Sequence, residues 1–239
     1  MKKEAESYFK YLQTIGVEYL DRDQTAARRP IVTDEGETAL AVKNAGRKSN
    51  EAQTSSLAEL AKNVAKCKKC VLHKTRTQTV FGSGDEKAKI MFVGEAPGAD
   101  EDEQGLPFVG RAGKLLTSMI EAERSLAISR GKVYIANVLK CRPPGNRPPA
   151  PDEVESCEGY LKTQIALIKP SFICALGTHA AHTLLKTKEP IGKLRGRWFE
   201  YEGIPLLATY HPSFLNRSPE YKKESWKDLL MLKEAAVGK

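Results

Sequence analysis

Four short apolar runs that alternate with segments of helical periodicity constrain the fold of this 239-residue chain more than any other feature. The runs, which we predict to be strands, are KIMFVG (89–94), VYIANV (133–138), FICALG (172–177) and PLLATYH (205–211). Segments of helical character lie between the runs, at 112–128, 151–168 and 178–187. Strands that alternate with helices of this length favour an α/β domain with a mostly parallel sheet. We therefore predict an α/β fold around a central sheet of four strands.

Residues suited to ligand binding or catalysis lie at the ends of these predicted strands. In parallel sheets, ligands bind beyond the carboxyl ends of the strands. The motif GEAPG follows the first run, Asn137 stands near the end of the second, and Gly177 and His211 close the third and fourth. These residues should converge on one edge of the sheet, so we predict one functional site there.

The stretch GEAPGADEDEQGLPFVG (94–110) combines glycines, carboxylates and an aromatic ring directly after the first strand. Glycine lets a backbone approach a ligand closely because it has no Cβ atom. We expect Asp100, Asp102 and Glu103 to be solvated loop acids. Phe108 is either a core residue or a flat surface for a ligand.

Four of the five cysteines have a pattern that suggests a metal centre. Cys67 and Cys70 form a CxxC pair, whose thiolates can turn to the same side and chelate a metal. Cys141 and Cys157 would complete a four-thiolate shell for zinc or an iron–sulfur cluster, unless they are ordinary core residues. Cys174 lies within an apolar run, so we expect it to be a packing residue.

The charge of the chain favours a polyanionic partner. Thirty-eight Lys and Arg residues outnumber 30 Asp and Glu residues, which gives a formal net charge of +8. Such an excess favours nucleic acid or an anionic membrane surface. No apolar stretch reaches about 18 residues, so we expect no membrane span. The first residues do not have the pattern of a signal peptide, and we expect a cytoplasmic protein.

The first 56 residues differ from the rest in composition. We predict an amphipathic helix within residues 1–20, because large apolar residues recur there at near-helical spacing. This helix either packs on the main domain or docks a protein partner. Residues 21–56 are polar and aperiodic, as expected for a flexible linker. The main domain is predicted to span residues 57–239.

Five ordered motifs in that domain resemble the family 4 uracil-DNA glycosylases, the iron–sulfur branch of their superfamily. The motifs are CKKC (67–70), GEAPGADEDEQGLPFVGRAG (94–113), YIANVLKCRPP (134–144), Cys157 and HPSFL (211–215). The resemblance implies a three-layer α/β/α sandwich and a [4Fe-4S] cluster held by Cys67, Cys70, Cys141 and Cys157. It also implies a monofunctional, monomeric DNA-repair enzyme that removes uracil from single- or double-stranded DNA.

The resemblance also implies how a base would be bound. A base must leave the stack and enter a pocket before an enzyme can act on it. Phe108 would stack on the base, and the backbone of Gly94, Glu95 and Ala96 would lie against it. Asn137 would read the edge of uracil, because one carboxamide both donates and accepts a hydrogen bond.

Catalysis would involve three side chains. His211 would donate a hydrogen bond to the negative charge that develops on the departing base. Glu95 would orient a water molecule near the sugar. Glu101, the second acidic candidate, would shape the pocket.

Two further segments are expected to contact DNA. In the superfamily, the loop after the HPSFL histidine enters the duplex, which makes Leu215 the expected wedge, with Asn216 and Arg217 nearby for backbone contacts. The proline-rich run RPPGNRPPAPDE (142–153) either presses on a DNA strand or acts as a rigid spacer between two proposed cluster ligands.

Two other functions stay open. A relative that traps uracil-DNA covalently would need an additional histidine near the proline-rich run, and this run contains none. A zinc-stabilised nucleic-acid-binding module without catalysis would explain the charge and the cysteines, but it would leave Asn137, His211 and the GEAPG loop without roles.

Overall fold

The structure, a computed structural model, describes residues 56–237. The helix predicted within residues 1–20 and nearly all of the linker predicted for 21–56 lie outside the described residues. In the described part of the chain, no helix is both long enough and apolar enough to cross a membrane.

The centre of the domain is a six-stranded sheet with the order β1-β3-β2-β4-β6-β5. The strands are β1 (Ser83–Gly84), β2 (Ile90–Gly94), β3 (Tyr134–Asn137), β4 (Phe172–Leu176), β5 (Trp198–Tyr201) and β6 (Ile204–Thr209). The four predicted runs form β2, β3, β4 and β6, which pair in parallel, as expected.

The predicted number of four strands was wrong, because β1 and β5 add antiparallel edges to the sheet. The β1 strand has only two residues, one of them glycine, and β5 is partly exposed. Neither edge strand therefore has the continuous apolar run from which we recognised the buried strands.

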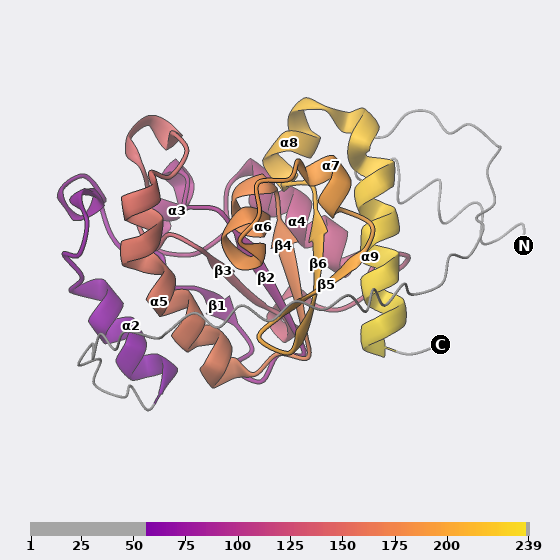
Figure 1. Ribbon diagram of the computed structural model, residues 1–239, viewed down its shortest axis with the longest axis horizontal. Coiled ribbons are helices and arrows are strands. Elements are labelled where there is room, and N and C mark those ends of the chain that lie inside the picture. The colour runs from indigo at the N-terminus through magenta and orange to yellow at the C-terminus, as the bar shows by residue number, and fades with distance from the viewer. Residues whose placement is uncertain (1–55, 238–239) are drawn as a thin grey trace, which may run out of the picture. The chain divides into compact units, whose positions relative to one another are not determined.

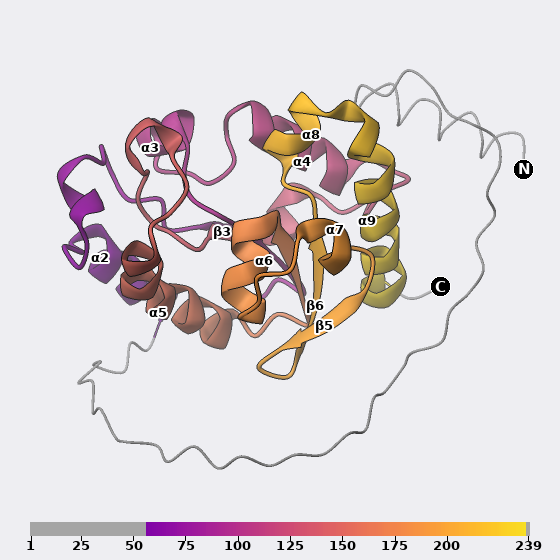
Figure 2. The same ribbon diagram turned by 45° about the horizontal axis from the view of Figure 1, so that its top comes forward.

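Helices cover both faces of the sheet, with α5 and α6 on one and α4 and α9 on the other, which confirms the three-layer α/β/α fold (Figures 1 and 2). The α-helices are α2 (Leu57–Ala65), α3 (Ala99–Gln104), α4 (Arg111–Glu121), α5 (Pro151–Ile168), α6 (Thr178–Leu185), α7 (Ile191–Leu194), α8 (Pro212–Arg217) and α9 (Lys222–Val237). Short 3-10 turns are η1 (Val71–Lys74), η2 (Arg130–Lys132), η3 (Pro144–Asn146) and η4 (Pro219–Tyr221).

The predicted helices differ in how well their ends were placed. Helix α5 spans the predicted 151–168, with a proline in its first turn and the Glu153 carboxylate accepting a hydrogen bond from the backbone N–H of Ala150. Helix α4 ends at Glu121, short of the predicted 128. Leu126 is buried beyond its end, which preserved the apolar spacing that suggested a longer helix.

The strand register brings the predicted site residues to one edge. Gly94 pairs with Asn137, Val93 with Ala175, and Leu176 with Thr209. The loops that follow these strands therefore begin at nearly the same level. Helices α3 and α8 lie at this end of the sheet, which is at the top in Figures 1 and 2.

Candidate active site

A pocket of about 720 Å³ opens at this edge of the sheet. That volume lies within the range of small-molecule sites. Of the predicted site residues, seven line the pocket: Glu95, Ala96, Glu101, Phe108, Asn137, His211 and Arg217. Gly94 lies directly behind it, because a Cβ atom there would clash with the side chains of Asn137 and Phe108. The predicted convergence is therefore present in the fold.

Phe108 forms a buried wall of the pocket. Its φ angle is 54°, a left-handed conformation that costs a non-glycine residue of order 1 kcal/mol or more. The Arg130 guanidinium holds this turn by donating to the carbonyl oxygens of Pro107, at 2.8 Å, and Phe108, at 3.0 Å. The ring centroid lies 5.6 Å from that of His211. The aromatic surface thus faces the same space as the histidine.

Asn137 is buried at the end of β3, with its side chain at the pocket. Its Oδ1 atom has no hydrogen-bond partner among the described residues. A buried acceptor left unpaired costs about 1–3 kcal/mol, so a donor on a ligand would relieve this cost. The backbone carbonyl of Asn137 accepts a 2.7 Å hydrogen bond from Lys140 Nζ, which holds the strand end in place.

Lys140 connects the pocket wall to the cysteines, a link that we did not predict. Its ammonium also donates to Gln164 Oε1 at 2.5 Å, and its backbone N–H donates to Cys157 Sγ at 3.3 Å. Complete burial lowers the pKa of Lys140 to about 8, although Cys157 opposes this shift. Only the tertiary fold brings these groups together, because Gln164 and Cys157 lie on α5.

His211 is the N-cap of α8, and its tautomer follows from its contacts. Nδ1 accepts a hydrogen bond from the backbone N–H of Ser213 at 3.1 Å and lies 2.7 Å from Ser213 Oγ. Nδ1 therefore carries no proton, and the neutral ring must carry its proton on Nε2. Burial lowers the pKa of His211 to about 4, with smaller contributions from Arg217 and His179. The ring is a neutral hydrogen-bond donor at pH 7.

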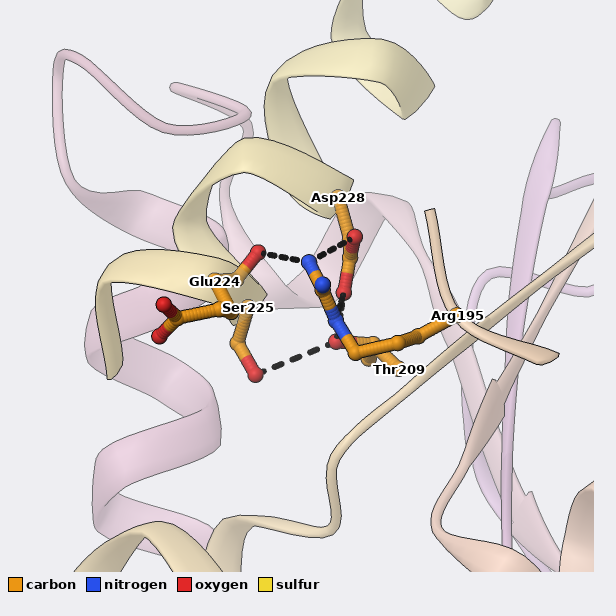
Figure 3. Close-up of polar contacts among 5 residues, drawn as sticks. All are labelled: Arg195, Thr209, Glu224, Ser225 and Asp228. Carbon is orange, nitrogen blue, oxygen red and sulfur yellow. Dashed lines mark hydrogen bonds and ion pairs between the residues drawn. The ribbon is translucent and has the colours of Figure 1, made fainter. Parts of the chain in front are cut away.

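A buried polar network holds the strand that leads to His211 (Figure 3). Asp228 on α9 accepts a 2.6 Å hydrogen bond from Thr209 Oγ1, and its two oxygens pair with Arg195 at 2.6 and 3.0 Å. Ser225 Oγ lies 3.1 Å from the same Thr209 hydroxyl. Burial raises the pKa of Asp228 to about 6, opposed by Thr209 and Arg195. We did not predict this network, whose members are up to 33 residues apart.

The carboxylate of Glu101 is occupied by backbone amides. Oε1 accepts from the N–H groups of Val109 and Gly110 at 2.9 and 3.0 Å, and Oε2 accepts from Gly98 at 3.0 Å. Glu101 therefore joins the two ends of the loop that carries Phe108. This contact set fits the expected shaping of the pocket and does not fit a catalytic acid.

Asp102 is not the solvated loop acid that we expected from the sequence. It is buried, and both of its carboxylate oxygens lie 3.0 Å from the backbone N–H of Thr77. The acidic run forms helix α3, whose turn directs Asp102 inward while Asp100 and Glu103 are exposed, as expected. The prediction of a solvated Asp102 was wrong because it treated the run as an extended loop.

The expected wedge is not exposed. Residues 212–217 form helix α8, and the Leu215 side chain is only 1% exposed. Helical spacing directs Leu215 into the core in this structure, and its entry into the duplex stays a prediction. Asn216 is half-buried, whereas Arg217 is exposed and lines the pocket.

Comparison with known proteins agrees with this geometry. Residues 81–230 match the model of the uracil DNA glycosylase superfamily. The chain belongs to this superfamily. It is 44% identical over 187 residues to a type-4 uracil-DNA glycosylase of Archaeoglobus fulgidus, which covers 75% of this chain and 92% of the relative.

Two other relatives have the same name and similar coverage. A type-4 uracil-DNA glycosylase of Pyrobaculum aerophilum is 47% identical over 185 residues, which cover 73% of this chain and 90% of the relative. One of Thermotoga maritima is 44% identical over 174 residues, which cover 71% and 89%. The relatives confirm the resemblance seen in the motifs.

In this superfamily member, a second and smaller cavity is lined by all four cysteines of the predicted metal centre: Cys67, Cys70, Cys141 and Cys157. They come from the α2–η1 connection, the segment after β3, and α5. Within residues 56–237, no group of three or more His, Cys, Asp or Glu side chains is arranged to hold a metal ion directly.

Hydrogen-bond donors surround these sulfurs. Arg76 Nη1 donates to Cys141 Sγ at 3.0 Å, and the backbone N–H of Lys69 donates to Cys67 Sγ at 3.5 Å. Burial raises the pKa of the Cys157 thiol to about 11 and raises that of Cys141, where Arg76 opposes the shift. Burial thus outweighs the pKa-lowering effect of Arg76 at Cys141 and of Lys140 at Cys157. Cys174 is fully buried in β4.

The proline-rich run reaches the rim of the pocket. Pro143, Asn146, Arg147 and Pro148 line it. The run also leads from Cys141 to α5, where Arg147 forms a bidentate pair with Glu153 at 2.6 and 2.9 Å. Its position is compatible with both predicted roles, as a spacer and as a surface beside DNA.

Proposed function

We propose that this protein is a DNA-repair glycosylase that binds uracil flipped out of DNA and hydrolyses its N-glycosidic bond, which releases uracil and leaves an abasic site. The observation that carries the proposal is the facing arrangement of Asn137, His211 and Phe108 in one pocket. Membership of the uracil-DNA glycosylase superfamily and the names of the relatives support the same activity.

Recognition of uracil would use the side-chain amide of Asn137, whose Oδ1 has no partner among the described residues. Its Oδ1 would accept from the N3–H of uracil, and its Nδ2 would donate to O4. The hydrogen bond from Lys140 to the Asn137 carbonyl fixes the strand end that carries this amide, and exclusion of cytosine would require the amide to keep the same orientation. Phe108 would stack on the base, which contributes about 1–3 kcal/mol toward the cost of unstacking it from DNA.

Bond cleavage would use two side chains that line the pocket. As the C1′–N1 bond breaks, its electron pair leaves with uracil, and His211 Nε2–H would donate a hydrogen bond to O2. Because His211 is neutral, it would stabilise the anion without transferring a proton. Glu95 would orient a water molecule and take a proton from it as the water oxygen bonds to C1′.

We also propose that Cys67, Cys70, Cys141 and Cys157 hold a [4Fe-4S] cluster. The four cysteines line one cavity, and the donors from Arg76, Lys69 and Lys140 would stabilise thiolates that ligate a cluster. When bound, the cluster would join the segment after α2 to α5. Iron and sulfide analysis of the purified protein tests this, and a colourless zinc protein would contradict it.

Several wider expectations belong to this proposal. The enzyme would act as a monomer on uracil-containing DNA in the cytoplasm, without covalent trapping. The helix expected within residues 1–20 would pack on the main domain or dock a partner, joined through residues 21–56 to the catalytic domain at 57–239.

One experiment tests the activity directly. Pure protein is incubated with an oligonucleotide that contains one deoxyuridine, and abasic sites are then cleaved with alkali. Strand cleavage only in the deoxyuridine oligonucleotide, and not in a thymidine control, is the expected result. An oligonucleotide that remains intact after long exposure to iron-loaded protein would refute the function.

A further inference from the structure

Arg130 contacts the wall of the pocket from behind, and it has no role in the proposed reaction. Its Nη2 donates to the backbone carbonyl oxygens of Pro107 and Phe108 at 2.8 and 3.0 Å, and its Nη1 donates to Thr117 Oγ1 at 2.8 Å. Phe108 is among the described residues that line the pocket, whereas Arg130 is not. Arg130 therefore contacts the aromatic wall without entering the space where a base would lie.

Helix α4 and the turn η2 fix the position of Arg130. Its backbone N–H, at the start of η2, donates to Glu121 Oε1 at 2.8 Å, and both Glu121 and Thr117 belong to α4. The guanidinium group has five N–H donors in a rigid planar fork, so it can bind a hydroxyl group of α4 and two carbonyl groups of the Phe108 turn at once. A lysine ammonium group on its flexible stem does not reproduce this arrangement.

The backbone of Phe108 requires such support. Its φ angle is 54°, and a non-glycine residue keeps this conformation only where the surrounding structure holds it. The first turn of α4 packs directly against it, because a Cβ atom at Gly113 would overlap the Phe108 carbonyl oxygen. The Glu101 carboxylate accepts hydrogen bonds from the amides of the two residues that follow Phe108. The turn is thus held through its amides by Glu101 and through its carbonyls by Arg130.

We propose that Arg130 is a positioning residue that sets the Phe108 ring for stacking on the flipped base, so that its loss slows uracil release while DNA affinity is kept. The inference rests on the proposed function, because it assigns Arg130 to the stacking wall of that site. The Phe108 and His211 ring centroids are 5.6 Å apart, so a displaced Phe108 ring would present the base wrongly to the His211 donor. A misplacement of about 1 Å can cost as much as 10²-fold in rate.

The first test is a double-mutant cycle in single-turnover uracil release by the full-length protein, with protein in saturating excess. Arg130→Ala should slow release about 10- to 100-fold. In a Phe108→Ala background the same change should slow it less than about twofold, because the ring that Arg130 positions is already absent. Arg130→Lys should lose nearly as much as Arg130→Ala, since it keeps the charge and loses the fork. Lys132→Ala, at an exposed position of the same turn, is the matched control and should keep the wild-type rate.

Three results would overturn the inference. Losses that multiply in the double variant would place the effect of Arg130 outside the aromatic wall, and a full rate in Arg130→Lys would reduce its role to charge. Weaker DNA binding with an unchanged rate at saturation would assign Arg130 to a DNA phosphate. Circular dichroism checks that each variant is folded, and Arg130→Gln, which keeps one amide donor group, replaces Arg130→Ala if that variant does not fold.

A second measurement needs no activity. The Phe108 ring current shifts the NMR signals of the neighbouring His211 ring, so Phe108→Ala should move these signals and Arg130→Ala should move them in the same direction. Signals that stay unchanged in Arg130→Ala, although Phe108→Ala moves them, would refute the inference. A wild-type protein that releases no uracil but shows both shifts would refute the proposed function and leave the hold of Arg130 on Phe108 established.

Discussion

The Nδ1 atom of His211 accepts a hydrogen bond from the backbone N–H of Ser213, and this contact leaves the ring proton on Nε2. The Nε2–H donor therefore lies at the start of α8, shortly after the end of β6. The His211 and Phe108 ring centroids are 5.6 Å apart, so a base stacked on Phe108 would lie beside this donor.

Removal of the pocket's polar groups should affect turnover more than binding. We expect Asn137→Ala and His211→Ala each to slow single-turnover uracil release by about 10²–10³-fold, the cost typical of a lost donor to a developing anion. DNA affinity, measured by fluorescence anisotropy, should stay nearly unchanged, because phosphate contacts dominate it. Near-normal turnover in both variants would refute the assignment of the pocket.

His211 should not titrate near neutral pH. Burial holds its pKa at about 4, whereas the unfolded chain has the ordinary value near 6.5. Between these values the unfolded state binds the extra proton, so this residue's contribution to stability is lost as the pH falls from about 6.5 toward 4. NMR of the ring should show no titration of His211 from pH 5.5 to 8.

The network around Asp228 should carry more stability than an exposed ion pair. Arg195→Ala would leave the fully buried Asp228 without its cation, which typically costs about 3–5 kcal/mol. Arg197→Ala removes the exposed pair with Glu189 and should cost less than about 1 kcal/mol. Urea unfolding of the two variants measures both values. Equal costs would show that the network in Figure 3 is not a stabilising element.

The proposed cluster ligands can be separated from the remaining cysteine. Cys141→Ala should lose iron and lower the melting temperature, because the cavity would lose one of four thiolates. Cys174→Ala, in the core strand β4, should keep its iron even if the truncation destabilises the fold. Retention of full iron content by Cys141→Ala would contradict its role as a ligand.

The sequence by itself determined the parallel core of this protein and most of the pocket. Buried parallel strands are continuous apolar runs, and their carboxyl ends form one edge, so Asn137, His211 and the GEAPG loop could be placed together without coordinates. The boundaries of α5 were also predictable, because Pro151 and Glu153 are local start signals. The strands and the start of α5 could be predicted because each depends on residues that are close together in the sequence.

Only the tertiary structure decided which groups stand beside these residues. The register of β2 and β4 places His179 near Glu95, and Arg195 forms an ion pair with Asp228, which is 33 residues away in the sequence. The tertiary structure also packs Leu215, the expected wedge, into the core. Sequence periodicity predicts which strand ends share an edge, but it does not predict which side chains of distant segments meet. Those contacts determine the partner, the burial and the ionisation of each side chain.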